Sequence, residues 1–187
     1  MDNNELLQCI EILKKGGTVI LQTSLGQIIA TNAYDNKAVK KITEIKSQLN
    51  TESLIITDNE SKLNMLLEDI PSLAYDLLEN TNKPLIIKYD KPSGFDADFL
   101  NEDRTLSIYI SKDEIIRQIT NRGIKALATV SLTIASKSQQ WLVPGIPETI
   151  LQKADYIVNL QQENSPSFTS PTVISLKMNG EIKILQK

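Results

Sequence analysis

The stretch that decides the fold is Leu13-Lys14-Lys15-Gly16-Gly17-Thr18-Val19-Ile20-Leu21-Gln22-Thr23-Ser24. Its glycine pair predicts the end of an amphipathic helix over about residues 4–15, because glycine readily adopts the conformation that closes a helix. The apolar residues that follow predict a short buried strand over 18–21, which runs into polar residues. In an open α/β sheet, ligands usually bind beyond the carboxyl ends of such strands. We therefore expect a ligand groove near Thr23 and Ser24.

The rest of the chain alternates helical and strand patterns, which predicts an α/β fold. Helices are expected over 38–45, 62–67, 72–79, 112–121 and 148–153, strands over 54–56, 84–87, 106–110, 126–134 and 156–158, a polar turn at 136–138, and loops over 88–104 and 161–171. Two strands over 172–176 and 181–185 flank Asn179-Gly180, a pair that suits a type I′ turn. The chain has 187 residues, 41% of them hydrophobic, and shows no internal repeat. We expect one domain over 1–187.

The composition excludes several kinds of catalytic site. The chain has no histidine, so histidine-dependent nucleophiles, general bases and zinc sites are excluded. The one cysteine, Cys9, lies among apolar residues at helical spacing and is expected in the core. Acidic residues in the region 96–103 lack the spacing of a metal site, and we expect them to solvate a loop. We predict no catalytic residue, no resident metal and no cofactor; ATP and magnesium would enter only with a nucleotide-using activity.

Charge and hydropathy limit the partners of the chain. No apolar run approaches the ~20 residues that span a bilayer, and the N-terminus is not a signal peptide, so we expect a soluble cytoplasmic protein with no membrane partner. Residues 1–50 have six lysines against five acids, residues 51–103 have four against twelve, and residues 104–187 have ten basic residues against six acids. The pI of about 5.1 argues against strong nonspecific binding of nucleic acid but allows a local basic face.

Taken in order along nearly the whole chain, these segments resemble the YrdC/YciO family, the L-threonylcarbamoyladenylate synthases. The family's Lys-Gly-Gly and apolar strand usually lead into Pro-Thr-Asp-Thr-x-Tyr-Gly-Leu, of which this chain keeps Thr23. Its Lys-x-Arg motif keeps Lys46 but has Gln48 in the arginine place. The resemblance implies a twisted mixed β-sheet with flanking helices and a concave groove. It implies these groove residues: Thr23, Ser24, Lys46, Thr129, Ser131, Ser170 and Thr172.

The same comparison predicts that the site has lost its charged groups. The family's arginine places hold Gln48, Tyr109 and Gln186, and the chain's only arginines lie elsewhere, at Arg104, Arg117 and Arg122. Guanidinium groups bind oxyanions in a bidentate way, and loss of one preorganised donor commonly costs ~10²–10³-fold in rate. We therefore expect weak ATP binding and little synthase activity.

Apolar residues stand at further places where the family has polar groups or glycine: Leu25, Ile28, Ile86, Val130 and Leu132. Such side chains bind phosphate poorly. They predict either that the old site has closed into core or that it is a drier pocket for another ligand.

Three functions remain open. The first is a translation or tRNA-modification factor with double-stranded RNA binding and little or no catalysis, since the resemblance implies a link to tRNA threonylcarbamoyladenosine formation. The second is a nucleotidyltransferase, an L-threonylcarbamoyladenylate synthase that uses ATP, threonine and bicarbonate at a rebuilt site. The third is a noncatalytic module that binds a small metabolite or a protein partner.

The lysines of the predicted helix over 38–45 and its ends generate a first prediction. Lys37, Lys40 and Lys41 share a helix face, and Lys46 follows one turn later. These lysines form either a solvated helix face or a contact for duplex RNA or tRNA. If RNA binds there, we predict weak binding, with an affinity that falls steeply with salt and is equal for scrambled sequences. Fluorescence anisotropy over a salt series measures this. Binding that ignores salt, or that survives the change of these lysines to glutamine, contradicts the assignment.

Overall fold

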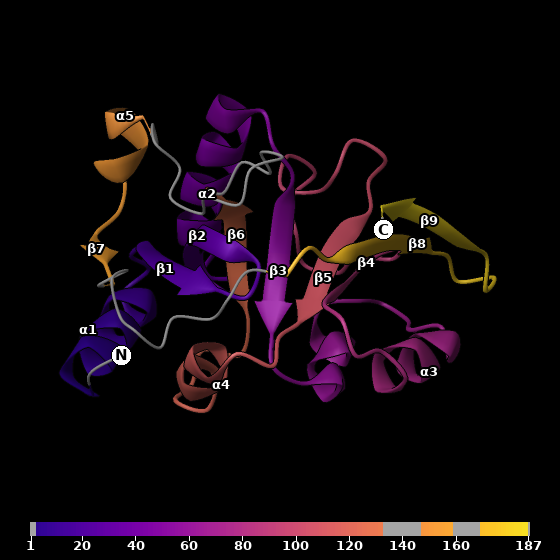
Figure 1. The fold of residues 1–187 in the computed structure, drawn as a ribbon. Coiled ribbons are helices and arrows are strands. Elements are labelled where there is room, and N and C mark those ends of the chain that lie inside the picture. The colour runs from indigo at the N-terminus through magenta and orange to yellow at the C-terminus, as the bar shows by residue number, and fades with distance from the viewer. Residues whose placement is uncertain (1–2, 133–146, 159–168, 187) are drawn as a thin grey trace.

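A computed structural model describes residues 3–132, 147–158 and 169–186. In it one mixed sheet has the strand order β7-β1-β2-β6-β3-β5-β4-β8-β9 (Figure 1). Its strands are β1 (Val19–Thr23), β2 (Gly26–Asn32), β3 (Ser53–Thr57), β4 (Leu85–Tyr89), β5 (Leu106–Ile110), β6 (Leu127–Ser131), β7 (Tyr156–Ile157), β8 (Thr172–Leu176) and β9 (Ile182–Gln186). The α/β class is thereby confirmed, with a mixed sheet and flanking helices.

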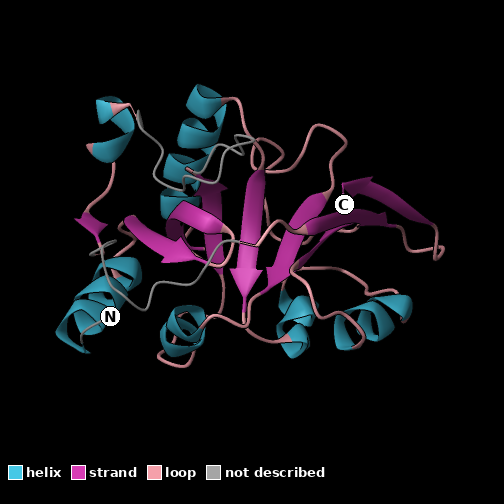
Figure 2. Cartoon of the chain, viewed as in Figure 1, coloured by secondary structure: helices cyan, strands magenta, loops and turns pink. Residues whose placement is uncertain are grey.

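Helices flank this sheet (Figure 2). They are α1 (Asn3–Lys14), α2 (Asn36–Leu49), α3 (Leu73–Glu79), α4 (Glu114–Thr120), α5 (Glu148–Leu151) and a short 3₁₀ helix, η1 (Glu60–Met65). Helix η1 replaces the α-helix predicted over 62–67. Among the described residues no helix is both long enough and apolar enough to cross a membrane.

The glycine pair ends α1 as the sequence predicts. Gly16 has a φ of +73°, and the N–H of Gly17 returns to the carbonyl of Ile12 at 2.9 Å. A Cβ on Gly17 would lie 2.5 Å from a methyl carbon of Ile12, so a larger residue would push the helix end away. The chain therefore leaves α1 and enters β1 within a few residues, which places the start of β1 beside the helix.

One hairpin of the sheet is not predicted from the sequence. Strand β1 continues to Thr23, and Ser24-Leu25 turns it back into β2, with Thr23 paired to Gly26. The Thr23 hydroxyl donates to the carbonyl of Gly26 at 3.0 Å and accepts from the N–H of Leu25 at 3.2 Å. The turn has no Asn-Gly or Asp-Gly signal, so its stability depends on this threonine.

The C-terminal hairpin has the predicted strands but another turn. Gly180 has a φ of +84°, whereas Asn179 is not among the described non-glycine residues with positive φ, so the type I′ prediction is wrong. The N–H of Gly180 donates to Lys177 at 2.9 Å, and the N–H of Lys177 donates to Glu181 at 3.0 Å. The loop is therefore one residue longer, and glycine stands at its left-handed third position.

Apolar side chains cover both faces of the sheet. One face packs under α2, η1 and α3 around Ile42, Ile55 and Phe99. The other packs under α1 and α4 and contains Cys9, whose burial raises the pKa of its thiol to about 12, so the prediction of a core cysteine is confirmed. A nucleophilic role for this thiol is excluded, because thiolate forms far above neutral pH.

Strand β6 alternates between the two faces and decides between core and pocket for Val130 and Leu132. Val130 and Leu132 belong to the core on the α2 face. Thr129 and Ser131 point to the opposite face, because successive strand residues alternate. The apolar residues at 130 and 132 therefore do not line a groove. The end of the strand predicted over 126–134, the turn at 136–138 and most of the loop at 161–171 lie outside the described residues.

The position of Leu132 gives a stability prediction. Its side chain is 4% exposed in the core, so Leu132→Asn leaves a buried amide without partners and should lower the free energy of unfolding by about 1–3 kcal/mol. Leu185→Asn is the matched control, because Leu185 is 44% exposed on β9. Thermal and urea unfolding of both variants measures the difference. A neutral Leu132→Asn would contradict the packing described above.

Candidate functional site

A cavity of about 240 Å³ lies over the middle strands, on the sheet face that also carries α1 and α4. We name it the sheet cavity. Its apolar lining is Leu25, Ile28, Leu54, Ile86, Pro171 and Val173, and its polar lining is Thr51, Glu52, Ser53, Ser107, Thr129, Ser131, Ser170 and Gln186. Hydroxyl groups dominate the polar side chains, so the cavity suits a small polar molecule of low net charge better than a triphosphate.

The strand register brings this lining together from distant parts of the chain. Ile28 on β2 stands opposite Ser131 on β6, and Thr129 on β6 stands opposite Leu54 on β3. The Thr129 hydroxyl donates to the carbonyl of Leu54 at 2.8 Å, which commits its proton to the backbone. Hydroxyls and aliphatic groups therefore alternate across the floor of the cavity.

The predicted groove residues divide into two groups. Thr129, Ser131 and Ser170 line the sheet cavity. Thr23 does not, because its side chain is buried in the β1–β2 turn, and Thr172 is not part of the lining either. The structure does not bring these two residues into the cavity, because the resemblance placed motifs along the chain without showing which face each side chain occupies.

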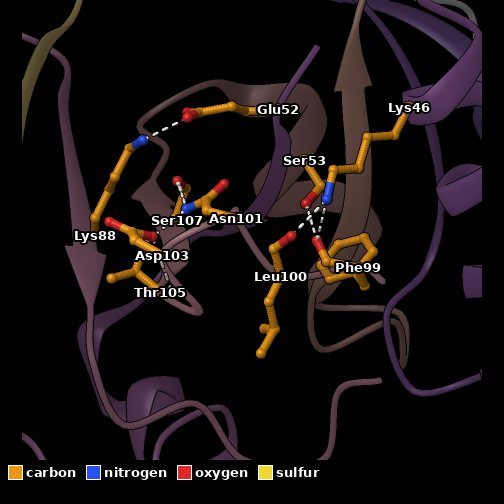
Figure 3. A network of polar contacts seen from close by, with 10 residues as sticks. All are labelled: Lys46, Glu52, Ser53, Lys88, Phe99, Leu100, Asn101, Asp103, Thr105 and Ser107. Carbon is orange, nitrogen blue, oxygen red and sulfur yellow. Dashed lines mark hydrogen bonds and ion pairs between the residues drawn. The ribbon is translucent and has the colours of Figure 1, made fainter. Parts of the chain in front are cut away.

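The ammonium of Lys46 is hydrogen-bonded to backbone carbonyls of the protein itself. Near the end of α2 this ammonium donates to three successive carbonyls, of Asp98 at 2.9 Å, Phe99 at 3.2 Å and Leu100 at 2.5 Å. Figure 3 shows the contacts with Phe99 and Leu100. The Ser53 hydroxyl donates to the carbonyl of Phe99 as well. Three donors meet three acceptors, so the ammonium is fully used. Burial lowers the pKa of Lys46, although nearby acids oppose this.

This contact also removes Lys46 from the predicted RNA surface. Lys37 and Lys40 are exposed on α2, as is Lys41, whose ammonium donates to the carbonyl of Gly16 at 3.2 Å. The basic face of α2 therefore consists of three lysines, and its binding to RNA stays a prediction.

A second polar network joins Asp103, Thr105 and Asn101 to the cavity residue Ser107 (Figure 3). The Thr105 hydroxyl donates to Asp103 at 2.6 Å, and the Asn101 amide donates to Thr105 at 2.9 Å and to Ser107 at 3.0 Å. Burial raises the pKa of Asp103, but the hydrogen bonds from Thr105 outweigh it and the pKa lies below its usual value. The sequence suggested only that Asp103 solvates a loop, and no motif identified Asn101.

Lys88 and Glu52 form an ion pair beside this network. Their closest atoms, Nζ and Oε1, are 2.6 Å apart. Lys88 stands directly opposite Ser107 in the pairing of β4 with β5, so both side chains rise from the same face of the sheet. Neither Lys88 nor Ser107 was a candidate from the sequence.

A second cavity of about 620 Å³ lies where β3 and β5 end. Its lining includes Ser24, whose hydroxyl lies 3.0 Å from Asp113 and 3.1 Å from the hydroxyl of Tyr109. Burial raises the pKa of Tyr109, so it is a neutral hydrogen-bonding group. The residue in a family arginine place therefore holds the tip of the β1–β2 hairpin and supplies no positive charge. Four carboxylates, Asp58, Glu60, Glu79 and Asp113, also line this cavity.

Neither cavity contains an arginine. Arg117 is paired with Glu114 on the surface of α4, with 2.6 Å between their closest atoms. Among the residues that the structure describes, no group of three or more histidine, cysteine or acidic side chains could hold a metal ion. Phosphate binding here would depend on lysines and neutral donors.

The model of the Sua5/YciO/YrdC family, described as "Telomere recombination", matches residues 11–187. The chain belongs to this family. The resemblance seen in the sequence is thereby confirmed.

Three known proteins are similar to this chain. A protein of Methanocaldococcus jannaschii named as a candidate threonylcarbamoyl-AMP synthase is 29% identical over 167 residues, 86% of this chain and 77% of that protein. The crystal structure of E. coli YciO has a TM-score of 0.75 at 18% identity, over 100% of this chain and 90% of YciO. P. abyssi Sua5 complexed with L-threonine has a TM-score of 0.73 at 20% identity, over 94% of this chain but 52% of Sua5. The two structures show a shared fold.

The role given to Lys46 can be tested by Lys46→Met, which keeps the chain length but removes the donor to three carbonyls. We expect the free energy of unfolding to fall by about 1–3 kcal/mol, since hydrogen bonds to charged groups contribute that much. The control is Lys40→Met on the exposed face of the same helix, which should change stability by less than about 0.5 kcal/mol. Urea unfolding compares the two. Equal stability of both variants would contradict the structural role.

Proposed function

We propose that this protein is a slow synthase of the threonylcarbamoyl-AMP type, which joins threonine, bicarbonate and ATP into an acyl-adenylate for tRNA threonylcarbamoyladenosine formation. The observation that carries the proposal is the relative named for this activity, which is 29% identical over 86% of this chain. The comparisons favour this function over the noncatalytic, RNA-associated one suggested by the lost motifs.

The lining of the sheet cavity supports the amino-acid part of this proposal. Threonine carries a methyl group, a hydroxyl group and two charged groups on a small frame. The cavity offers aliphatic contacts from Ile28, Ile86 and Val173 and hydroxyls from Ser131 and Ser170 within about 240 Å³. A small hydroxylated amino acid therefore matches the cavity in size and polarity.

The expected slowness follows from the missing positive charges. No arginine lines the cavity, and the ammonium of Lys46 is held by three carbonyls. A triphosphate would lack the bidentate donors that stabilise charge in phosphoryl and acyl transfer. ATP should then bind weakly and react slowly.

A second candidate is a noncatalytic module that binds the amino acid or another small metabolite. The observation that favours it is that the ammonium of Lys46 is already bound by three carbonyls, which leaves it no free donor for a nucleotide. Under the synthase candidate tRNA is a proposed partner, with the exposed lysines of α2 as its proposed contact, whereas the noncatalytic module needs no RNA.

An assay of pyrophosphate release with ATP, magnesium, threonine and bicarbonate tests the proposal. We expect release that needs both threonine and bicarbonate, with a turnover well below about 1 per second, the lower end of ordinary enzyme rates. Ser131→Leu, which fills the cavity from an exposed position, should abolish it, whereas Ser61→Leu on η1 should not.

Two outcomes would change the conclusion. Calorimetric binding of threonine without pyrophosphate release would favour the noncatalytic module. Turnover at or above about 1 per second would show that the missing arginines have been fully replaced and would contradict the proposed slow site.

A further inference from the structure

We propose that Lys88 and Ser107 form a subsite for a small oxyanion at the edge of the sheet cavity, and that Glu52 is the internal anion that a ligand displaces. The inference rests on the proposed function, because it names the group that would bind the negative charge of the ligand. It concerns residues outside the motifs on which the family resemblance depends.

The orientation of the Asn101 amide follows from its neighbours. The Thr105 hydroxyl donates its proton to the carboxylate of Asp103 at 2.6 Å, so its oxygen can only accept from Asn101. The amide must therefore present its nitrogen to Thr105, and the same nitrogen lies 3.0 Å from the oxygen of Ser107. Asp103 thus determines the direction of the whole chain of hydrogen bonds.

Ser107 is both a hydrogen-bond acceptor and a cavity residue. Its oxygen accepts from Asn101, and the side chain lines the sheet cavity. No acceptor for the Ser107 proton is found among the described residues. The hydroxyl is therefore held as a donor, ready for an acceptor atom in the cavity. Asn101 is a positioning residue in this arrangement.

The two members of the Lys88–Glu52 ion pair differ in exposure. Its side chain is 11% exposed, whereas that of its partner Glu52 is 61% exposed. A mostly buried ammonium needs an anion close by, and its loss is costly. An exposed carboxylate on a flexible side chain can leave its partner at little cost. A ligand anion could then take the place of Glu52, which itself lines the cavity.

The geometry points to an anion because two donors rise from neighbouring positions on one face of the sheet, Ser107 in the cavity lining and Lys88 beside it, next to the lining residue Glu52. Lys88 supplies positive charge and Ser107, its cross-strand neighbour, supplies a hydroxyl. A carboxylate and a phosphate group share the oxygen acceptors that this pair would bind. The carboxylate would come from an amino acid and the phosphate from a nucleotide, and the experiment separates these sources.

The test is an NMR titration of ¹⁵N-labelled protein with sodium acetate and, separately, sodium phosphate, at constant ionic strength maintained with sodium chloride. The backbone amides of Ser107 and Lys88 report binding. We expect saturable shifts, an affinity at least about tenfold weaker in Lys88→Met, and one at least about threefold tighter in Glu52→Gln, because the internal competitor is gone. The preferred probe identifies the source of the anion.

The matched control is Glu102→Gln, which removes an equal charge from an exposed residue that is also near Lys46. It should leave the affinity within about twofold of the natural protein. Equal tightening in both glutamine variants, or none in Glu52→Gln, overturns the subsite. If Lys88→Met does not fold, the comparison of the two glutamine variants still decides. The titration needs no turnover. It can therefore show anion binding in a protein without synthase activity, and the synthase assay can show activity in a protein that lacks this subsite.

Discussion

The contact on which the rest of the site depends is the ammonium of Lys46 on three successive carbonyls of the loop before β5. It joins the end of α2 to a backbone segment whose carbonyl at Leu100 is part of a buried residue, and a buried acceptor left unpaired costs roughly 1–3 kcal/mol. The third of these carbonyls belongs to Leu100, next to Asn101. The same contact therefore sets the place of the amide that orients Ser107, so the core side of the sheet and the cavity side are coupled through one loop.

The fold could be predicted largely from local signals. The glycine pair at Gly16 and Gly17, the apolar strand runs and the hairpin near Gly180 act over a few residues, and each appears in the structure close to where the pattern places it. The β1–β2 hairpin was not predicted, because Ser24-Leu25 has no turn signal. The Thr23 hydroxyl stabilises this turn. Turn type is also harder to predict than turn position, because one extra loop residue moves the glycine from the second loop position to the third.

The site was less predictable, because it depends on which face each strand residue occupies and on partners far along the chain. A strand has a period of two, so an apolar residue at 130 and a hydroxyl at 129 have opposite fates. Motif order named Thr129 and Ser131, which line the cavity, but left Val130 and Leu132 open between core and pocket. Pairings such as Lys46 with residues 98–100 join positions about fifty residues apart, and a single sequence contains no signal for them.

The two lysines near the cavity show how one charge can serve opposite purposes. The acceptors of Lys46 are neutral carbonyls of the backbone, which cannot leave without unfolding the loop, so the ammonium is lost to ligands. The acceptor of Lys88 is a carboxylate on an exposed side chain, which can move into water. If a ligand anion replaces Glu52, the buried ammonium of Lys88 stays paired throughout. The ligand therefore has to supply only the difference in free energy between the two ion pairs. A chain without arginine in its site can thus retain an anion subsite, provided that its lysine is paired with a displaceable acid.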